Sequence, residues 1–427
     1  MSTARGTARL PLGLTFGAVA ACGLVTLGAA ITSHTVHRDA LLDQSASAEF
    51  VVTSANDAGP GTLRDAILAA DRLSSHCHIV IRVPHIVIES ALPALINPRG
   101  VELEAAPGAG TIDADREQKG PAVEVKATGS ILTRLHVIHA HGYGILIDAS
   151  GVQLDSVTVQ DSKVGIMLGA SASGAIIRAS LLERDETGLS AEPGIRHVTL
   201  ASDTFRLNSR AGLWFVGAAA AGRGTPPNAA ASDPVIRVLG TVFEKNATGV
   251  VLANEASFMR QDHFIDNQTA LTVLGGAATI DDSEIRGSVA DAVSVISGHS
   301  VVLDGNMLVD NKATALMVRD SDVSIETNTV ARNGVGLVLI GGPGGFTPLI
   351  RGNRITDNRG DGVMLIGGAA RLEDNQLLSN RGAGLRPLDF VAGNTRLKAA
   401  PRSRGNVFHA NALDVAPTGV YRLKAGS

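Results

Sequence analysis

Short apolar runs separated by Gly, Asn and Asp recur along most of the chain, and their spacing is most regular in the C-terminal half. The segment Asn306 to Asn311 returns at residues 328–333, 353–358, 375–380 and 406–411, and the third residue of every copy is apolar. The first residues of successive copies lie 22, 25, 22 and 31 positions apart. No segment between the copies is long enough for a helix with a 3.6-residue period. The pattern therefore predicts short strands and turns that repeat roughly every 22 residues.

Looser copies of this motif extend the repeat toward the N-terminus. The third residue of each copy is again apolar, except Thr158. A Gly or Ala followed by an apolar triplet marks the next strand, and counting from these landmarks gives about 12 repeats beginning at residue 122. Three short strands and three turns per repeat make one rung of a parallel β-helix, whose rungs stack about 4.8 Å apart. The looser copies are Asp262/Asn267, Thr241/Asn246, Asp203/Asn208, Ser180/Asp185 and Ser156/Asp161.

The repeated asparagines are expected to support the fold. Equivalent residues of successive rungs lie above one another in such a stack, so each Asn side chain can bond to the rungs on either side. Asn also tolerates the left-handed backbone conformation of tight turns. We therefore interpret the Asn columns as structural rather than as a ligand site.

A cap is predicted ahead of the repeats. Residues 50–54 have the composition of a strand, and Thr62 to Asp65 resembles the start of a helix with a capping box. The positions 63, 66, 67 and 70 are apolar and share one face of that helix. A solenoid needs its open end covered, because its apolar interior and strand edges are otherwise exposed. This helix is the predicted lid.

The cap also carries a resemblance to a known family. The segment VVTSANDAGPGTLRDAILAAD at residues 51–71, followed by residues 86–93, resembles the N-terminal cap and first rungs of bacterial right-handed parallel β-helix proteins, the pectate-lyase-like solenoids. With the repeats, the resemblance covers about residues 49–411. The resemblance implies a right-handed parallel β-helix that is located outside the cytoplasm. The family includes polysaccharide lyases, C5-epimerases, glycoside hydrolases and surface proteins without known chemistry, so the fold does not choose among them.

The expected architecture is an all-β, single-domain right-handed parallel β-helix of about 12 rungs with an N-terminal capping helix. Residues 49–110 would form the cap and first rungs, residues 111–411 the β-helix and residues 412–427 a C-terminal tail. Residues 1–33 would form a signal peptide or membrane anchor, followed by a linker at 34–48.

The first 33 residues predict export. Arg5 and Arg9 precede an uncharged stretch from Leu10 to Ser33, which ends in small residues. A cleaved signal peptide, an uncleaved inner-membrane anchor and a lipoprotein signal at Cys22 all remain open, because the stretch is long enough to span a bilayer. Each of them places the body of the protein in the periplasm or outside the cell.

Composition narrows the partners. The net charge of −4 excludes a uniformly basic nucleic-acid binder, and two cysteines cannot form a disulfide framework. Aromatic residues make up only 3 % of the chain, whereas neutral sugars are usually bound by stacking on Trp or Tyr. We expect a monomer that binds an acidic polysaccharide, does not bind nucleic acid, and contacts a membrane only through its N-terminal segment.

The densest polar cluster lies on the early rungs. A lyase or C5-epimerase removes the proton beside a uronate carboxylate, which requires a base and a cation that neutralises the carboxylate. In this interpretation His139, His141 or Tyr143 is the base. The candidate catalytic residues are His139, His141, Tyr143 and Arg184, and the candidate substrate-binding residues are Asp161, Lys163 and Asp185.

The cations of this cluster would be Arg184 or Lys163, which neutralise the substrate carboxylate. Asp161 and Asp185 are expected to stack at one corner, where they orient the cation or bind a metal. The opposing interpretation is structural: Asp can replace Asn at a turn, and surface His is common. No cofactor is required and no metal ligand is assigned, although Ca²⁺ is kept as an option. The two function classes are thus an enzyme of the lyase or C5-epimerase type and a non-catalytic envelope solenoid that binds or guides a polysaccharide or a surface partner.

Overall fold

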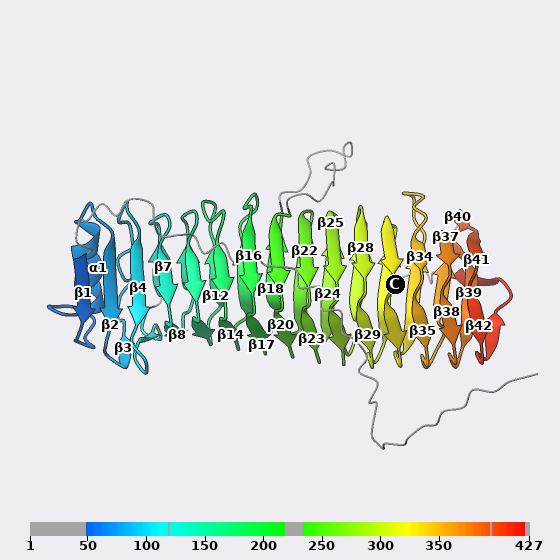
Figure 1. The fold of residues 1–427 in the computed structure, drawn as a ribbon, viewed down its shortest axis with the longest axis horizontal. Coiled ribbons are helices and arrows are strands. Elements are labelled where there is room, and N and C mark those ends of the chain that lie inside the picture. The colour runs from blue at the N-terminus through cyan, green and yellow to red at the C-terminus, as the bar shows by residue number, and fades with distance from the viewer. Residues whose placement is uncertain (1–47, 118–119, 218–233, 393–394, 423–427) are drawn as a thin grey trace, which may run out of the picture. The chain divides into compact units, whose positions relative to one another are not determined.

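A computed structural model describes residues 48–117, 120–217, 234–392 and 395–422. Nearly all of its strands pair in parallel and run in three sheets, each of which receives one strand from every rung (Figure 1). The predicted parallel β-helix is therefore confirmed. The expectations for residues 1–33 and most of the linker at 34–48 lie outside the described residues.

Sheet A contains the strand that opens each rung, and its 15 strands follow one another in the order of the chain. They are β1 (Ala48–Val52), β2 (Cys77–Ile81), β4 (Val101–Ala105), β7 (Ile131–Thr133), β10 (Gln153–Asp155), β13 (Ile176–Arg178), β16 (Val198–Ala201), β19 (Ile236–Leu239), β22 (Ala256–Arg260), β25 (Ala277–Asp281), β28 (Val301–Asp304), β31 (Val323–Glu326), β34 (Leu349–Arg351), β37 (Gly368–Glu373) and β41 (Ala399–Arg404).

Sheet B follows sheet A after a one- or two-residue turn in most rungs and has 14 strands. Most of them are three residues long, so the middle residue points inward and its two neighbours point outward. They are β3 (His85–Val87), β5 (Thr111–Asp113), β8 (His136–Ile138), β11 (Thr158–Gln160), β14 (Leu181–Glu183), β17 (Thr204–Arg206), β20 (Val242–Glu244), β23 (His263–Ile265), β26 (Glu284–Arg286), β29 (Met307–Val309), β32 (Thr329–Ala331), β35 (Arg354–Thr356), β38 (Gln376–Leu378) and β42 (Val407–His409).

Sheet C closes each rung, and it also receives strands from the predicted tail, because β43 and β44 both pair with β39. The strand β40 is the exception to the parallel arrangement, since it pairs antiparallel with β39. The strands are β6 (Val123–Val125), β9 (Tyr143–Ile147), β12 (Val164–Leu168), β15 (Thr187–Ala191), β18 (Ala211–Val216), β21 (Thr248–Ala253), β24 (Thr269–Leu274), β27 (Val293–Ile296), β30 (Thr314–Arg319), β33 (Val335–Ile340), β36 (Val363–Ile366), β39 (Ala383–Ala392), β40 (Thr395–Leu397), β43 (Leu413–Val415) and β44 (Gly419–Arg422).

The interior is a continuous column of inward-pointing apolar side chains. Stacked rings form part of it, with centroids 5.1 Å apart for Phe205 and Phe243 and 5.0 Å apart for Phe243 and Phe264. Each of these rings comes from a different rung of sheet B and is fully buried. No rung encloses this core alone, so the rungs stabilise one another.

The Asn columns lie at two corners of the stack, as expected, and are buried except for Asn406 and Asn411. The left-handed residues are not the asparagines themselves but those before them, such as Asp310 and Arg332. Asn333 Nδ2 donates to Asn358 Oδ1 at 3.1 Å and to the carbonyl of Leu308 at 2.9 Å. Its own Oδ1 accepts from the backbone N–H of Asn311 at 3.0 Å. Each amide thus satisfies the polar backbone of the turn next to it, which confirms the structural interpretation.

The predicted helix is present at the N-terminal end as α1 (Leu63–Asp71). Thr62 accepts a hydrogen bond from the backbone N–H of Asp65, which satisfies one donor of the first turn. The predicted apolar face, which includes Leu63 and Ile67, is buried in the same core as the first strands. The helix lies beside β1 and β2 in Figure 1.

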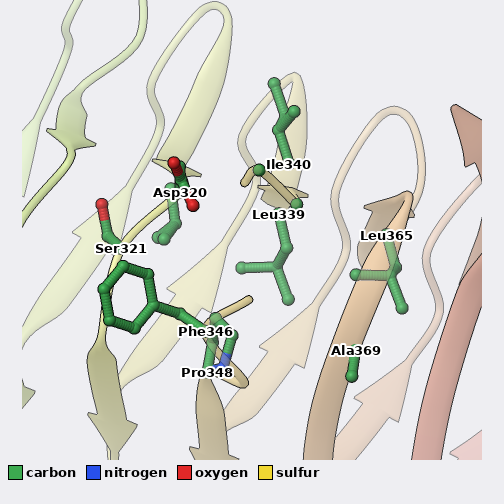
Figure 2. Close-up of a pocket in the computed structure, with 11 residues that line it drawn as sticks. Asp320, Ser321, Leu339, Ile340, Phe346, Pro348, Leu365 and Ala369 are labelled. Atoms are coloured by element: carbon green, nitrogen blue, oxygen red, sulfur yellow. The ribbon is translucent and has the colours of Figure 1, made fainter. Parts of the chain in front are cut away.

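The loop after β33 packs against the solenoid. Figure 2 shows Phe346 and Pro348 facing Asp320 and Ser321 across a small gap. This cavity has a volume of about 10 Å³, which is the space of one water molecule. Gly344 N–H donates to Asp320 Oδ1 at 2.9 Å and holds the loop down. The cavity is too small for a sugar.

Candidate functional site

Six of the seven predicted site residues lie on the outer surface, at or beside the turn between sheets B and C. His139, Asp161 and Arg184 occupy equivalent positions on three successive rungs, with left-handed φ values of 58°, 55° and 59°. The parallel register of β8, β11 and β14 places them one above the other. The structure therefore brings a base, an acid and a cation into one outward column.

Asp185 is the exception, and its predicted stacking on Asp161 is wrong. Asp185 is 1 % exposed, and its Oδ1 accepts from the backbone N–H of Ser162 at 2.8 Å. Its own N–H donates to Asn208 Oδ1, so it belongs to the inward Asn column. Burial raises the pKa of Asp185 to about 8, and its Oδ2 has no hydrogen-bond partner among the described atoms. This carboxyl cannot reach a substrate on the outer surface.

The error is a register shift of one residue on a single rung. The sequence pairs Ser156/Asp161 with Ser180/Asp185, but Val157 N–H donates to Ser180 Oγ and Ser162 takes the place opposite Asp185. Val159 then fills the core position that was predicted for Thr158. Because side chains alternate along a strand, a shift of one position exchanges the outer and inner faces.

His139 is oriented by a carboxylate from the rung below. Its Nδ1 lies 3.1 Å from Asp113 Oδ1 on β5. Since an ionised carboxylate only accepts, Nδ1 is the donor of this hydrogen bond, and in the neutral imidazole Nε2 is then the nitrogen with the lone pair. Within the described part of the chain, Nε2 has no hydrogen-bond partner, and the side chain is 46 % exposed. The second oxygen of Asp113 lies 3.5 Å from His85 Nε2.

Asp161 and Arg184 form a two-pronged ion pair beside His139. Arg184 Nε and Nη2 donate to the two oxygens of Asp161 at 3.0 and 2.8 Å. The hydrogen bonds from Arg184 lower the pKa of Asp161, while those from Asp161 raise the pKa of Arg184. Arg184 also pairs with Glu183, which in turn pairs with Arg206. The guanidinium of Arg184 is therefore already paired with two carboxylates of the protein, those of Asp161 and Glu183.

His141, Lys163 and Tyr143 line the same turn two to four residues further on. His141 Nε2 lies 2.9 Å from the carbonyl oxygen of Asp115. Lys163 N–H donates to the carbonyl of Ala140, which places Lys163 one rung above His141. The Lys163 ammonium has no ion-pair partner among the described residues and is exposed. Tyr143 begins β9 and is 37 % exposed.

Sequence reasoning missed several members of this surface. Gln160 Nε2 donates to Glu183 Oε1 at 2.9 Å, and Gln160 Oε1 lies 3.1 Å from His136 Nε2. Asp113, Gln160 and Glu183 occupy equivalent outward positions on three sheet B strands. Strand alternation would have identified them once the register was known. We call the connected set Asp113, His139, Gln160, Asp161, Glu183 and Arg184 the His139 cluster.

The side chains of His139, Asp161 and Arg184 are 46 %, 36 % and 43 % exposed, so this part of the cluster lies at the surface. A cavity of about 160 Å³ lies instead on sheet A, where Phe258 and Thr279 are among its lining residues.

Comparisons with known proteins agree on the fold. The family described as "Right handed beta helix region" matches residues 121–279 and 270–421. The A-module of mannuronan C-5 epimerase AlgE6 from Azotobacter vinelandii aligns with a TM-score of 0.50 at 12 % identity, over 88 % of this chain and 100 % of that one. The AlgE4 A-module from the same organism aligns with a TM-score of 0.50 at 14 % identity, over 86 % and 97 % of the two chains.

A third solved structure with this fold is the catalytic domain of a GH87 α-1,3-glucanase in complex with tetrasaccharides. It aligns with a TM-score of 0.50 at 12 % identity, over 90 % of this chain and 69 % of that one. A search of curated proteins found no match to the chain. Among the described residues, no helix is long and apolar enough to cross a membrane.

Proposed function

This chain belongs to the right-handed β-helix family, and on that premise we propose that it acts on a polysaccharide along the outer surface of its early rungs. The proposed substrate is a uronate polymer, and the reaction is removal of the C5 proton, as in a lyase or a C5-epimerase. Solved structures of the same fold include two proteins named mannuronan C-5 epimerases and one α-1,3-glucanase, which supports a polysaccharide as substrate.

The observation that carries the proposal is the His139–Asp113 pair at 3.1 Å. Asp113 fixes the ring of His139 and stabilises the imidazolium that forms when Nε2 takes a proton. The electron pair left at C5 delocalises into the substrate carboxylate. In a lyase this pair expels the oxygen at C4, whereas in an epimerase a proton returns from the opposite face.

Lys163 is assigned to the substrate carboxylate. Its ammonium is exposed and unpaired within the described residues, whereas Arg184 is already held by Asp161 and Glu183. A cation beside the carboxylate stabilises the charge that develops during proton removal. Arg184 then serves to fix the position of Asp161. We assign the acid on the other face to His141 or Tyr143, which follow His139 by two and four residues.

The direct test is exchange of the C5 proton with solvent. The full chain is incubated in D₂O with polymannuronate, polyguluronate and polygalacturonate, and deuterium at C5 is measured by NMR together with unsaturated uronide products. Exchange on one of these polymers supports the proposal. Absence of exchange, with polymer binding retained, contradicts it.

His139→Asn is the informative variant, because Asn tolerates the left-handed backbone at this position. We expect kcat to fall about 100-fold or more, since a positioned general base contributes at least that factor. Asp113→Asn should lower kcat and leave KM nearly unchanged, and Lys163→Gln should raise KM. Lys245→Asn is the matched control, because Lys245 has the equivalent left-handed position on a distant rung. An unchanged rate for His139→Asn would exclude His139 as the base.

A non-catalytic polysaccharide-binding solenoid is the second candidate. The internal pairing of Arg184 with Asp161 and Glu183 favours it. This candidate predicts polymer binding that weakens with salt and that survives His139→Asn.

Export belongs to the same proposal. The basic start and apolar stretch of residues 1–33 support transfer to the periplasm or the cell exterior. Fractionation of cells that express the full chain with an epitope at its C-terminus would test this. Recovery in the cytoplasmic fraction would contradict it.

A further inference from the structure

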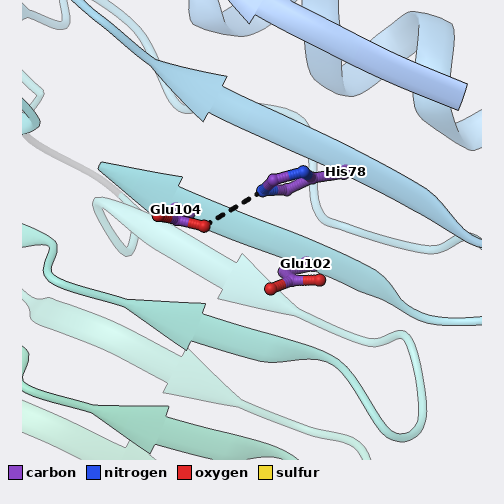
Figure 3. Close-up of side chains that lie close together, drawn as sticks. All are labelled: His78, Glu102 and Glu104. Atoms are coloured by element: carbon purple, nitrogen blue, oxygen red, sulfur yellow. Dashed lines mark hydrogen bonds and ion pairs between the residues drawn. The ribbon is translucent and has the colours of Figure 1, made fainter. Parts of the chain in front are cut away.

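A second polar cluster lies on the outer face of sheet A near the N-terminal end. His78 on β2 and Glu102 and Glu104 on β4 each offer one ligand atom, and these atoms all lie within 4.8 Å of one another. Figure 3 shows the three side chains close together on two neighbouring strands. We call these residues the His78 cluster.

The fold brings these residues together from distant parts of the sequence. Glu102 and Glu104 are two positions apart on one strand, so both face outward. The parallel register of β2 and β4 places His78 directly opposite Glu102. Glu49 on β1 lies opposite His78 on its other side and is exposed. Glutamates therefore occur on both strands that pair with β2, the strand of His78.

The spacing fits a small tetrahedral ion. His78 Nε2 lies 3.2 Å from Glu104 Oε2. Two ligands at zinc bond lengths of about 2.0–2.1 Å lie about 3.3 Å apart at tetrahedral angles. The pair is thus already at the required separation, and rotation about the side-chain bonds of Glu102 brings in the third ligand.

Two further contacts support metal binding over a simple ion pair. Arg134 pairs with the other oxygen of Glu104, Oε1, and its Nε donates to the carbonyl of Ala105 at 3.0 Å. This contact holds the carboxylate with Oε2 toward His78. Within the described residues, the Glu102 carboxylate has no hydrogen bond or ion pair, although it is half-buried.

We infer that the His78 cluster binds one divalent transition-metal ion, with Zn²⁺ as the best fit. An imidazole with two carboxylates suits Zn²⁺, whereas Mg²⁺ and Ca²⁺ prefer oxygen ligands alone. The ion would join two successive rungs, β2 and β4, and would leave a coordination position for water or for Glu49.

The test uses the full chain after removal of metal, titrated with ZnCl₂ alone in equilibrium dialysis. We expect one equivalent of zinc to bind, and Co²⁺ in its place to give the intense visible absorption of a tetrahedral site. His78→Gln and Glu102→Gln should each lower the zinc affinity at least about tenfold. The metal-free variants should unfold at the same temperature as the metal-free parent, because these side chains lie outside the core.

His263→Gln is the matched control. His263 Nδ1 lies 3.2 Å from Glu284 Oε2, so it forms the same kind of pair, but its register partners are Val242 and Glu284 and supply no second carboxylate. This variant should keep the parental affinity. The inference is overturned if the parent binds no zinc, if neither cluster variant weakens binding, or if His263→Gln weakens it equally. None of these results depends on whether polysaccharide is turned over.

Discussion

At a few positions of the buried Asn columns, an Asp carboxyl takes the place of the Asn amide. Asp185, Asp203 and Asp262 each take the place of an Asn at an inner corner, and burial raises their pKa values to about 8, 7 and 8. Oδ2 of Asp185 and of Asp262 has no hydrogen-bond partner among the described atoms. A protonated carboxyl resembles an amide in shape and can donate one hydrogen bond, whereas an ionised one is buried without compensation.

The stability of the protein should therefore depend on pH through these groups. Their native pKa values lie above the unfolded value of 3.8, so the folded state holds the proton more tightly. Their contribution is fully present below about pH 4 and is lost as the pH rises toward 8. Asp262→Asn should stabilise the protein by about 2 kcal/mol at pH 8 and by little at pH 4, as measured by urea unfolding.

Asp282→Asn is the control for this prediction, because Asp282 lies in a nearby turn and its side chain is 52 % exposed. It should change stability little at either pH. An equal gain from Asp262→Asn at pH 4 and pH 8 would show that the carboxyl does not titrate in the folded protein.

At the scale of the element, the turn depends on the Asn columns rather than on its own sequence. Asn333→Ala would remove the acceptor of the Asn311 backbone N–H and the donor to the Leu308 carbonyl, both of which are buried. We expect a loss of about 3 kcal/mol in the free energy of unfolding, since each unsatisfied buried group costs about 1–3 kcal/mol. Chemical denaturation measures it.

Arg332→Asn is the control at the neighbouring position. Arg332 has a left-handed backbone that Asn tolerates, and its ion pair with Asp310 lies on the surface. This substitution should cost less than about 1 kcal/mol. A similar cost for both variants would contradict the special role of the buried amide.

The elements that the sequence predicted best are those with strict repeats. Asn306, Asn328 and Asn353 fix the register of the later rungs, and the helix is fixed by the Thr62 cap and its apolar face. The rung at 157–162 was misplaced because Val157 and Ser162 replace the usual corner residues. The composition of this strand fits two registers equally well, one with Ser156 and Asp161 at the corners and one with Val157 and Ser162.

Specific side-chain contacts between rungs were the other feature that the sequence did not predict. The His139–Asp113 pair joins residues 26 positions apart, and the His78–Glu104 pair also joins residues 26 positions apart. Both pairs span early turns whose lengths differ from the later repeat, so the period of about 22 residues does not predict them. Two of the sites that carry chemistry in our proposals therefore required coordinates.

At the scale of the whole molecule, each rung contacts only its neighbours. The protection of backbone amides from hydrogen exchange should therefore vary along the stack. We expect amide hydrogen exchange to be slowest in β17–β33, where rungs are covered on both sides, and fastest in β40, β43 and β44. Hydrogen exchange followed by mass spectrometry measures this gradient. Uniform protection from β1 to β44 would mean that the stack opens only as one cooperative unit.

The left-handed position that follows each sheet B strand from β8 to β42 places residues at a regular interval along the stack. His139, Asp161 and Arg184 begin a series that continues through Lys245 and Asp266 to Ala410, one residue per rung, of which only Gly287 has no side chain. Successive members are spaced by the strand separation of about 4.8 Å. Because the backbone there is the same whichever side chain it carries, one member can be exchanged without disturbing the others. If a long polymer binds along the stack, each rung contacts a different part of it, and a substitution in this series should change its contacts at one rung only.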